Sequence, residues 1–240
     1  MNTRRICIIC LPRSGSQLCE QLASELSNSY MLGEYFENWN RSNYDFDINN
    51  NIYVKKFAEI SCKLNLQQQF KEKLNLLSKA NPNQPLTLRL FAMDYYNKDT
   101  LLTIITKLKT LGFEFVTLTR DIKNQLLSFM ITVSYQTFKK QNVFGINSDI
   151  IDPIYIKLNV LGPIFDDLVN SSKNWENNLS TILNDVNYQK IKYDTIYSDM
   201  EQIYNTNFKY HGKKSINGDP LDLILNKTEV VEFLSNRGIS

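Results

Sequence analysis

The junction Cys7–Leu22, CIICLPRSGSQLCEQL, restricts the fold more than any other segment, because a short apolar run passes through one tight loop into a helical pattern. Residues 5–11, apolar after Arg5, are typical of a strand buried on both faces of a sheet. Residues 16–27 carry leucine at every fourth position from 18 to 26, which predicts one apolar helical face. A strand that leads at once into a helix favours folds in which these elements alternate.

The same alternation continues along the chain. Further strands are predicted over residues 86–91 and 113–118, with shorter extended segments at 30–32 and 190–193. Further helices are predicted over residues 53–79, 101–111, 122–138 and 153–183. This order predicts an α/β fold in which helices cover both faces of a parallel sheet. Because no long linker or repeat interrupts the 240 residues, we expect a single domain, 1–240.

Several residues predict where helices begin and end. Gly112 suits the position just after a helix, where a left-handed backbone is common. The dipeptide Gly162-Pro163 predicts a break within a helical segment. Asn226 with Glu229 three residues later resembles a capping box for the last helix, and Gly238 is expected to stop that helix.

The charge balance narrows the classes of function. The 27 basic and 25 acidic residues give a net charge of +2, which argues against a dedicated nucleic-acid-binding protein. A local cluster of cations could still bind a small anion. The first apolar run ends at Leu11, so it predicts neither a signal peptide nor a membrane span, and we expect a soluble, cytoplasmic protein.

The cysteines do not predict a metal site. Cys7 and Cys10 lie three residues apart in a predicted strand, so their side chains point to opposite faces. The chain has one histidine, His211, and no second pair of closely spaced cysteines. Buried reduced thiols are the favoured interpretation.

The loop Pro12–Ser16 has the features of an anion site. Ligands of parallel α/β sheets bind at the carboxyl ends of the strands, and the start of a helix presents unpaired N–H groups to an anion. Gly15 lets the backbone approach a ligand closely, and the Arg13 guanidinium can bind a phosphate or sulfonate through two hydrogen bonds. The alternative is an ordinary strand–helix turn with a surface arginine. The Walker A pattern G-x-x-x-x-G-K-[ST] is absent.

Residues 11–16, Leu-Pro-Arg-Ser-Gly-Ser, resemble the 5′-phosphosulfate loop of sulfotransferases that use 3′-phosphoadenylyl sulfate (PAPS), in particular the trehalose and tyrosylprotein types. The resemblance implies a three-layer, P-loop-NTPase-like fold with a central, mostly parallel sheet. It also implies that the loop and the start of the following helix bind PAPS, through Pro12, Arg13, Ser14, Gly15, Ser16 and Gln17.

A second segment carries the same resemblance. Phe115–Arg120 ends a predicted strand, and Ser128 follows Arg120 by eight residues on the next predicted helix. In the family, an arginine and a serine at this spacing bind the 3′-phosphate of the donor, which implies that role for Arg120 and Ser128. An ordinary strand-end arginine and helix serine is the other interpretation.

The segment Gly33–Phe36 resembles the part of the family that carries the general base. The resemblance implies that Glu34 takes the proton of the acceptor hydroxyl, with Glu37 as the fallback. Arg89 interrupts an apolar strand, and a charge in such a place needs a partner. By resemblance, Arg89 and Arg13 stabilise the transferred sulfonate.

Two further matches are weaker. Tyr193-Asp194 resembles the family's Tyr-Glu-Asp segment near the adenine, which implies that Tyr193 contacts the donor. The segment 213–219 resembles the loop that closes over the 3′-phosphate, which implies a contact from Lys214. Pro220 stands where the family has an aromatic residue, so a solvated basic turn remains an alternative for this segment.

The resemblance implies transfer of a sulfonate from PAPS to an acceptor hydroxyl by in-line attack, with no metal. The acceptor could be a carbohydrate, a lipid, a small molecule or a protein tyrosine, because residues 38–60 and 139–187, where it would bind, do not identify it. Two alternatives of other classes remain. One is a P-loop-like nucleotide or small-molecule kinase, and the other is a catalytically degenerate binding protein with the sulfotransferase fold.

Overall fold

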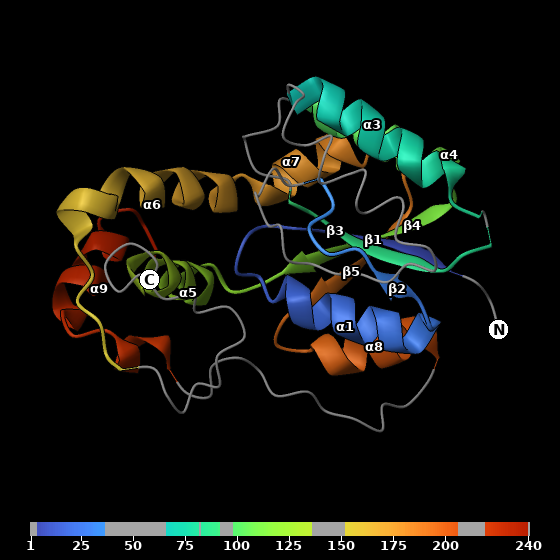
Figure 1. Ribbon diagram of the computed structural model, residues 1–240. Helices are drawn as coiled ribbons and strands as arrows, with labels where there is room; N and C mark the ends of the chain where they lie inside the picture. The colour runs from blue at the N-terminus through green and yellow to red at the C-terminus, as the bar shows by residue number, and fades with distance from the viewer. Residues whose placement is uncertain are drawn as a thin grey trace.

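A parallel sheet forms the centre of the molecule, and within the described residues its strands stand in the order β2-β3-β1-β4-β5 (Figure 1). They are β1 (Arg5–Cys10), β2 (Tyr30–Met31), β3 (Leu86–Phe91), β4 (Phe113–Thr119) and β5 (Tyr188–Lys192). The computed structural model describes residues 4–36, 66–81, 83–91, 98–135, 152–205 and 219–239. β1 pairs in parallel with β3 on one side and β4 on the other. The predicted α/β class and parallel pairing are confirmed.

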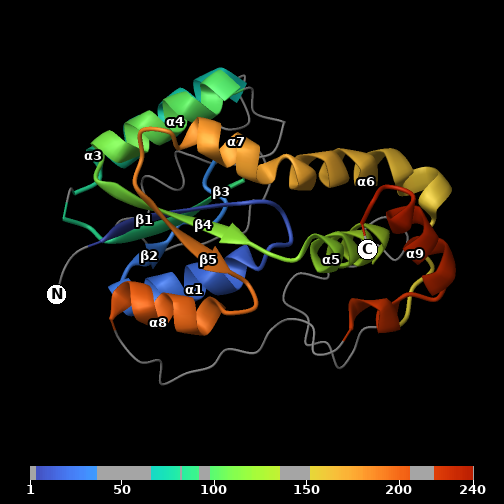
Figure 2. The same cartoon turned by 180° about the vertical axis from the view of Figure 1, so that it is seen from behind.

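Helices cover both faces of the sheet, as the alternation predicts. α1 (Ser16–Ser27) and α8 (Ile196–Tyr204) lie on one face, below the sheet in Figure 1. α3 (Leu66–Lys79), α4 (Lys98–Thr110) and α7 (Trp175–Ile182) lie on the other face, and Figure 2 shows the same arrangement from behind. The sheet is therefore a layer between two helical layers.

A second group of helices stands beside the sheet, at the left of Figure 1. It contains α5 (Ile122–Ser134), α6 (Leu158–Lys173), α9 (Lys227–Ser235) and the short 3-10 helix η3 (Pro220–Leu223). α5 begins shortly after β4 ends, so this group extends from the carboxyl side of the sheet. No helix in the described ranges is long and apolar enough to cross a membrane.

Aromatic rings join the helices of this second group. Phe165 of α6 is fully buried and meets Phe129 of α5 and Phe233 of α9 edge to face, with ring centroids 6.1 and 6.3 Å apart. Such pairs contribute free energy beyond that of their buried area. The buried residues of this group belong to the same apolar cluster as those of α3, α4 and α7.

The alternation of side chains along β1 divides the core into two parts. Ile6, Ile8 and Cys10 pack with α1 and α8, whereas Cys7 and Ile9 pack in the cluster on the other face. All five side chains are almost completely buried, which explains why the strand is apolar throughout. The prediction that Cys7 and Cys10 point to opposite faces is confirmed.

Hydrogen bonds from Arg5 connect the turns at the amino-terminal end of the sheet. Arg5 donates from Nε to the carbonyl oxygen of Gln84 at 3.2 Å and from one terminal nitrogen to that of Leu111 at 3.0 Å. Its other terminal nitrogen reaches the carbonyl oxygen of Asn81 at 2.6 Å. One buried guanidinium thus satisfies carbonyls from the turns that precede β3 and β4.

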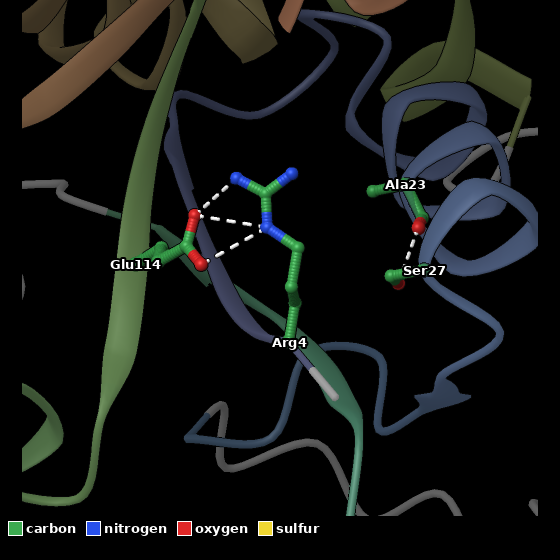
Figure 3. A network of polar contacts seen from close by, with 4 residues as sticks. All are labelled: Arg4, Ala23, Ser27 and Glu114. Atoms are coloured by element: carbon green, nitrogen blue, oxygen red, sulfur yellow. Dashed lines mark hydrogen bonds and ion pairs between the residues drawn. The ribbon is translucent and has the colours of Figure 1, made fainter. Parts of the chain in front are cut away.

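Arg4 forms a second contact at this end. Its Nε donates to both carboxylate oxygens of Glu114 at 3.0 and 3.1 Å, and the hydroxyl of Ser27 on nearby α1 donates to the Ala23 carbonyl at 2.6 Å (Figure 3). The Arg4 guanidinium also lies 4.6 Å from the centre of the Tyr204 ring. Because the Arg4–Glu114 pair is largely exposed, it contributes little to stability.

The predicted element boundaries agree closely with the structure. α1 and β3 have the predicted bounds, and β5 begins at Tyr188, two residues earlier than expected. Gly112 follows α4 with a φ of 77°, as its predicted position after a helix requires. The helix predicted over 53–79 is confirmed from Leu66 onward, and residues 53–65 lie outside the described part of the chain.

The break predicted at Gly162-Pro163 was wrong, because α6 runs through both residues. The helix ends instead at Asn174, where φ is −90° and ψ is 2°. Burial of Phe165 and Leu168 in the core stabilises the helical path, and this tertiary packing outweighs the local preference of Gly-Pro.

The capping box predicted before α9 was also wrong in its hydrogen bonds, although the helix begins directly after Asn226. The Asn226 side chain accepts from the Ile156 N–H at 2.9 Å and donates to the Ile156 carbonyl at 3.0 Å. It also donates to the Glu229 carboxylate at 2.9 Å. Because the amide is engaged with a neighbouring segment, it makes no capping bond to its own helix.

Replacement of Ile8 by alanine should reduce stability strongly, because its side chain is fully buried in the central strand. We expect Ile8→Ala to lower the free energy of unfolding by about 2–5 kcal/mol. Leu225→Ala is the control, since Leu225 is 64% exposed and should change this free energy by less than about 0.5 kcal/mol. Urea titration of both variants measures the difference, and equal losses would contradict the position of β1 in the core.

Candidate functional site

The loop between β1 and α1 turns sharply because two of its residues have a left-handed backbone. Arg13 has a φ of 62° and Gly15 a φ of 91°. Glycine adopts this conformation easily, whereas for arginine it costs about 1–3 kcal/mol, and such strain concentrates at binding sites. Gln125 of α5 donates to the Pro12 carbonyl at 2.7 Å, and Arg120 donates to the Arg13 carbonyl at 3.0 Å. These contacts hold the loop in its strained conformation.

The start of α1 leaves hydrogen-bond donors for a ligand. Gly15 is the N-cap and has no side chain with which to bond the first N–H groups of the helix. The hydroxyl of Ser14 is buried and has no hydrogen-bond partner of good geometry. Burial raises the pKa of the nearby Cys10 thiol to about 12, and this neutral thiol is only a weak partner for the hydroxyl. A buried hydroxyl in this position can donate a hydrogen bond to an oxygen of an anion bound at the start of α1.

The loop lies where the path of the chain across the sheet reverses. From β1 the chain crosses to β2 and β3 on one side, and from β4 it continues to β5 on the other. In parallel α/β sheets, such a reversal opens a crevice at the carboxyl ends of the two strands. Arg13 follows β1 and Arg120 follows β4, so both arginines stand at this crevice.

Four predicted site residues meet there, and we call them the arginine–serine cluster: Arg13, Ser128, Arg120 and Tyr193. Nε of Arg13 donates to Oγ of Ser128 at 3.3 Å. The guanidinium carbon of Arg120 lies 4.4 Å from the centre of the Tyr193 ring. The cluster joins the loop after β1, the β4–α5 segment and the end of β5, so the structure brings together residues far apart in the sequence.

Two partly buried cations stand side by side in this cluster. Burial, and the neighbouring charge of Arg120, lower the pKa of Arg13 to about 10. Burial also lowers the pKa of Arg120, although the charges of Asp194 and Asp121 oppose this shift. Both groups stay protonated near neutral pH, yet desolvation disfavours both charged forms and Arg120 repels Arg13. A bound anion would offset both costs, so the electrostatics favour a negatively charged ligand.

Tyr193 also packs directly on the loop. A Cβ atom built at Gly15 would lie 2.1 Å from Cδ2 and 2.2 Å from Cε2 of the Tyr193 ring, closer than any real contact. Burial raises the pKa of the Tyr193 hydroxyl, so the ring is neutral. Only glycine therefore fits at position 15 beside this ring.

A second group, the glutamate–arginine cluster, lies on the α1 side of the sheet and contains Ser16, Glu20, Glu34 and Arg89. Arg89 is in register with Ile8, so its side chain points to the face that α1 covers. The guanidinium contacts Oε2 of Glu20 at 2.7 Å and Oε1 of Glu34 at 3.3 Å. It also donates to Oγ of Ser16 at 3.3 Å. The expectation that Arg89 needs a charged partner is confirmed.

Sequence reasoning missed two residues of this site. Glu20 lies one helical turn after Ser16 and is buried, and Gln125 lies one turn before Ser128 on α5. Each lies one helical turn from a predicted site residue and so on the same face of its helix, and this spacing is the one signal in the sequence that could have indicated them.

Two predicted candidates are not tested by the structure, because Lys214 and the fallback base Glu37 lie outside the described residues. His211, which was given no role, also lies outside them. Gln17 is described and its side chain is exposed on the first turn of α1. In the described part of the chain, no three His, Cys, Asp or Glu side chains are grouped so that they could hold a metal ion.

Comparison with known proteins assigns no family. No protein-family model matches the chain, and no curated protein is significantly similar to it.

Gly15→Ala should be more damaging than the same change at Gly112, because the two glycines share a positive φ but not their surroundings. Gly112→Ala meets no atom within 4 Å, so it should cost about 1 kcal/mol for the backbone alone. Gly15→Ala must in addition displace the Tyr193 ring. Urea titration should show the larger loss at Gly15.

The double variant Gly15→Ala with Tyr193→Ala isolates the steric part of this loss. We expect Gly15→Ala to cost about as much as Gly112→Ala once the ring has been removed. If Gly15→Ala costs the same with and without the ring, Tyr193 does not pack on the loop.

Proposed function

We propose that this chain transfers a sulfonate group from PAPS to an acceptor hydroxyl. The observation that carries the proposal is the meeting of Arg13, Arg120 and Ser128 beside the start of α1. The motifs that resemble the sulfotransferase family lie far apart in the sequence, yet they converge at the carboxyl ends of β1 and β4. Such convergence is not expected of an ordinary surface arginine and a helix serine.

The sheet supports the same proposal. Within the described residues, a five-stranded parallel sheet of order 2-3-1-4-5, with the anion loop directly after its central strand, fits the three-layer, P-loop-NTPase-like fold that the resemblance implies. The loop departs from a Walker A sequence, because it carries Arg13 and contains no Gly-Lys-[ST] segment. The fold thus agrees with the proposal, and the loop chemistry favours a phosphosulfate over ATP–Mg²⁺.

The residues of the arginine–serine cluster fit the phosphate groups of the donor. We assign the 5′-phosphosulfate to the N–H groups at the start of α1 and to the buried hydroxyl of Ser14, whose neighbour, the Cys10 thiol, is only a weak partner. We assign the 3′-phosphate to Arg120 and Ser128. Arg13 contacts Ser128, so its guanidinium stands closer to the proposed 3′-phosphate than the resemblance alone implied. Tyr193 borders the same crevice and offers a ring surface for the adenine.

The glutamate–arginine cluster fits the reacting end of the donor. Glu34 is positioned to accept the proton of the acceptor hydroxyl as its oxygen forms a bond to sulfur. The bond between sulfur and the 5′-phosphate oxygen breaks, and 3′-phosphoadenosine 5′-phosphate leaves. Arg89 lies 3.3 Å from both Glu34 and Ser16, so it can stabilise negative charge that develops between the base and the loop.

Calorimetric titration with 3′-phosphoadenosine 5′-phosphate tests the donor site. We expect micromolar binding, weak binding of ATP–Mg²⁺, and loss of bisphosphate binding in Arg120→Ala because a charged hydrogen-bond donor is removed. Lys107→Ala is the control, since Lys107 is exposed in the last turn of α4.

The same titration separates the alternatives. Absence of bisphosphate binding by the wild-type protein would overturn the proposal, and tight ATP–Mg²⁺ binding would favour a kinase. Bisphosphate binding without turnover of any acceptor in a panel of carbohydrates, lipids, phenols and tyrosine peptides would favour a binding protein.

Glu34→Gln tests the general base. The amide cannot take the hydroxyl proton, so turnover of PAPS with an acceptor from the panel should fall by about 10²–10⁴-fold. Bisphosphate affinity should not fall, because glutamine removes a negative charge near Arg13 and leaves both cations of the arginine–serine cluster in place. Glu232→Gln, an exposed glutamate on α9, is the matched control. Full activity of Glu34→Gln would show that another group is the base.

A further inference from the structure

Glu20 is a buried carboxylate on α1 to which sequence reasoning gave no role. Its side chain is 4% exposed, and it lies between α1, β3 and the segment that follows β2. Burial raises the pKa of Glu20, while the charge of Arg89 and the N–H of Gly33 oppose this shift. A carboxylate in such a place is costly to the fold unless its partners are held firmly.

The two oxygens of Glu20 hold two different groups. Oε2 contacts Nε of Arg89 at 2.7 Å, and Oε1 accepts from the backbone N–H of Gly33 at 2.7 Å. The backbone of Arg89 also donates to the Gly33 carbonyl at 2.8 Å. Gly33 has a φ of 64° and directly precedes Glu34, so the position of Gly33 sets where Glu34 begins.

Glu20 contacts one nitrogen of the Arg89 guanidinium, and this contact determines which nitrogen can reach the other residues of the site. Because Glu20 contacts Nε, the terminal nitrogen Nη1 is directed to Oγ of Ser16 and to Oε1 of Glu34, both at 3.3 Å. Ser16 is the first residue of α1, next to the anion loop. Nη1 therefore stands between the loop and the proposed base.

We propose that Glu20 is a positioning residue, whose carboxylate fixes Arg89 and Gly33 and thereby places Nη1 of Arg89 and the carboxylate of Glu34 against the anion loop. The catalytic part of this inference rests on the proposed sulfonate transfer. The geometric part, that the charge of Glu20 orders the Arg89 guanidinium, does not depend on it.

The variant Glu20→Gln separates positioning from packing. Glutamine has nearly the same shape and can still accept from the Gly33 N–H, but it lacks the charge that holds Arg89. Glu25→Gln is the matched control, because Glu25 is on the same helix and is exposed. If Glu20→Gln fails to fold, Glu20→Asp takes its place in both measurements below, because the shorter side chain withdraws the carboxylate from Nε of Arg89 and from the Gly33 N–H.

The first measurement follows the Nε–H resonance of Arg89 by NMR, assigned with an Arg89→Lys variant. In the wild-type protein, we expect a resolved signal in slow exchange with water, since Nε is buried and lies 2.7 Å from the Glu20 carboxylate. In Glu20→Gln the exchange should be at least about tenfold faster, because the buried ion pair that holds the guanidinium is lost. Equal exchange in the two proteins would overturn the proposal whatever reaction the chain performs.

The second measurement compares kcat with the KM for PAPS, using an acceptor from the panel. We expect Glu20→Gln to lower kcat by about 10²-fold, because a reacting group is displaced, with the KM for PAPS and bisphosphate affinity nearly unchanged. Unchanged kcat in a variant with faster Nε–H exchange would overturn the catalytic part. If the wild-type protein binds no bisphosphate, the proposed function fails, and the NMR result still decides whether Glu20 positions Arg89.

Discussion

The complete burial of β1 between β3 and β4 is the constraint on which the site depends. Because β1 pairs with β3 along one edge and with β4 along the other, it lies in the middle of the sheet, and its carboxyl end lies at the crevice where the chain path reverses. The loop after β1 therefore lies beside the end of β4, because neighbouring parallel strands end at the same edge of the sheet. The parallel register also places Arg89 opposite Ile8, and so on the face that α1 covers.

Arginines at this edge of the sheet occupy two different electrostatic environments. Arg89 is balanced by two carboxylates, Glu20 and Glu34, and its charge is largely used within the protein. Burial and the charge of Arg120 instead lower the pKa of Arg13. Burial also lowers the pKa of Arg120, although Asp194 and Asp121 oppose this shift, so a bound anion would favour both charged forms. This difference divides the crevice into a part suited to phosphate groups and a part suited to proton transfer.

The sequence predicted correctly those elements that depend on interactions between residues close together in the chain. The buried strand, the loop and α1 follow from short patterns, and the spacing of Arg120 and Ser128 places both on the correct elements. Glu20 could not be predicted, because its burial depends on Arg89, a residue 69 positions later in the sequence. The uninterrupted α6 depends in the same way on packing of Phe165 against neighbouring helices, which no local pattern around Gly162-Pro163 reports.

The most direct test of the central claim is a crystal structure of the protein with 3′-phosphoadenosine 5′-phosphate. We expect the 5′-phosphate within hydrogen-bond distance of the Ser14 hydroxyl and the first N–H groups of α1. We expect the 3′-phosphate between the guanidinium groups of Arg13 and Arg120, in contact with Ser128. A nucleotide bound away from this crevice, or one whose phosphates contact neither the loop nor these arginines, would contradict the claim.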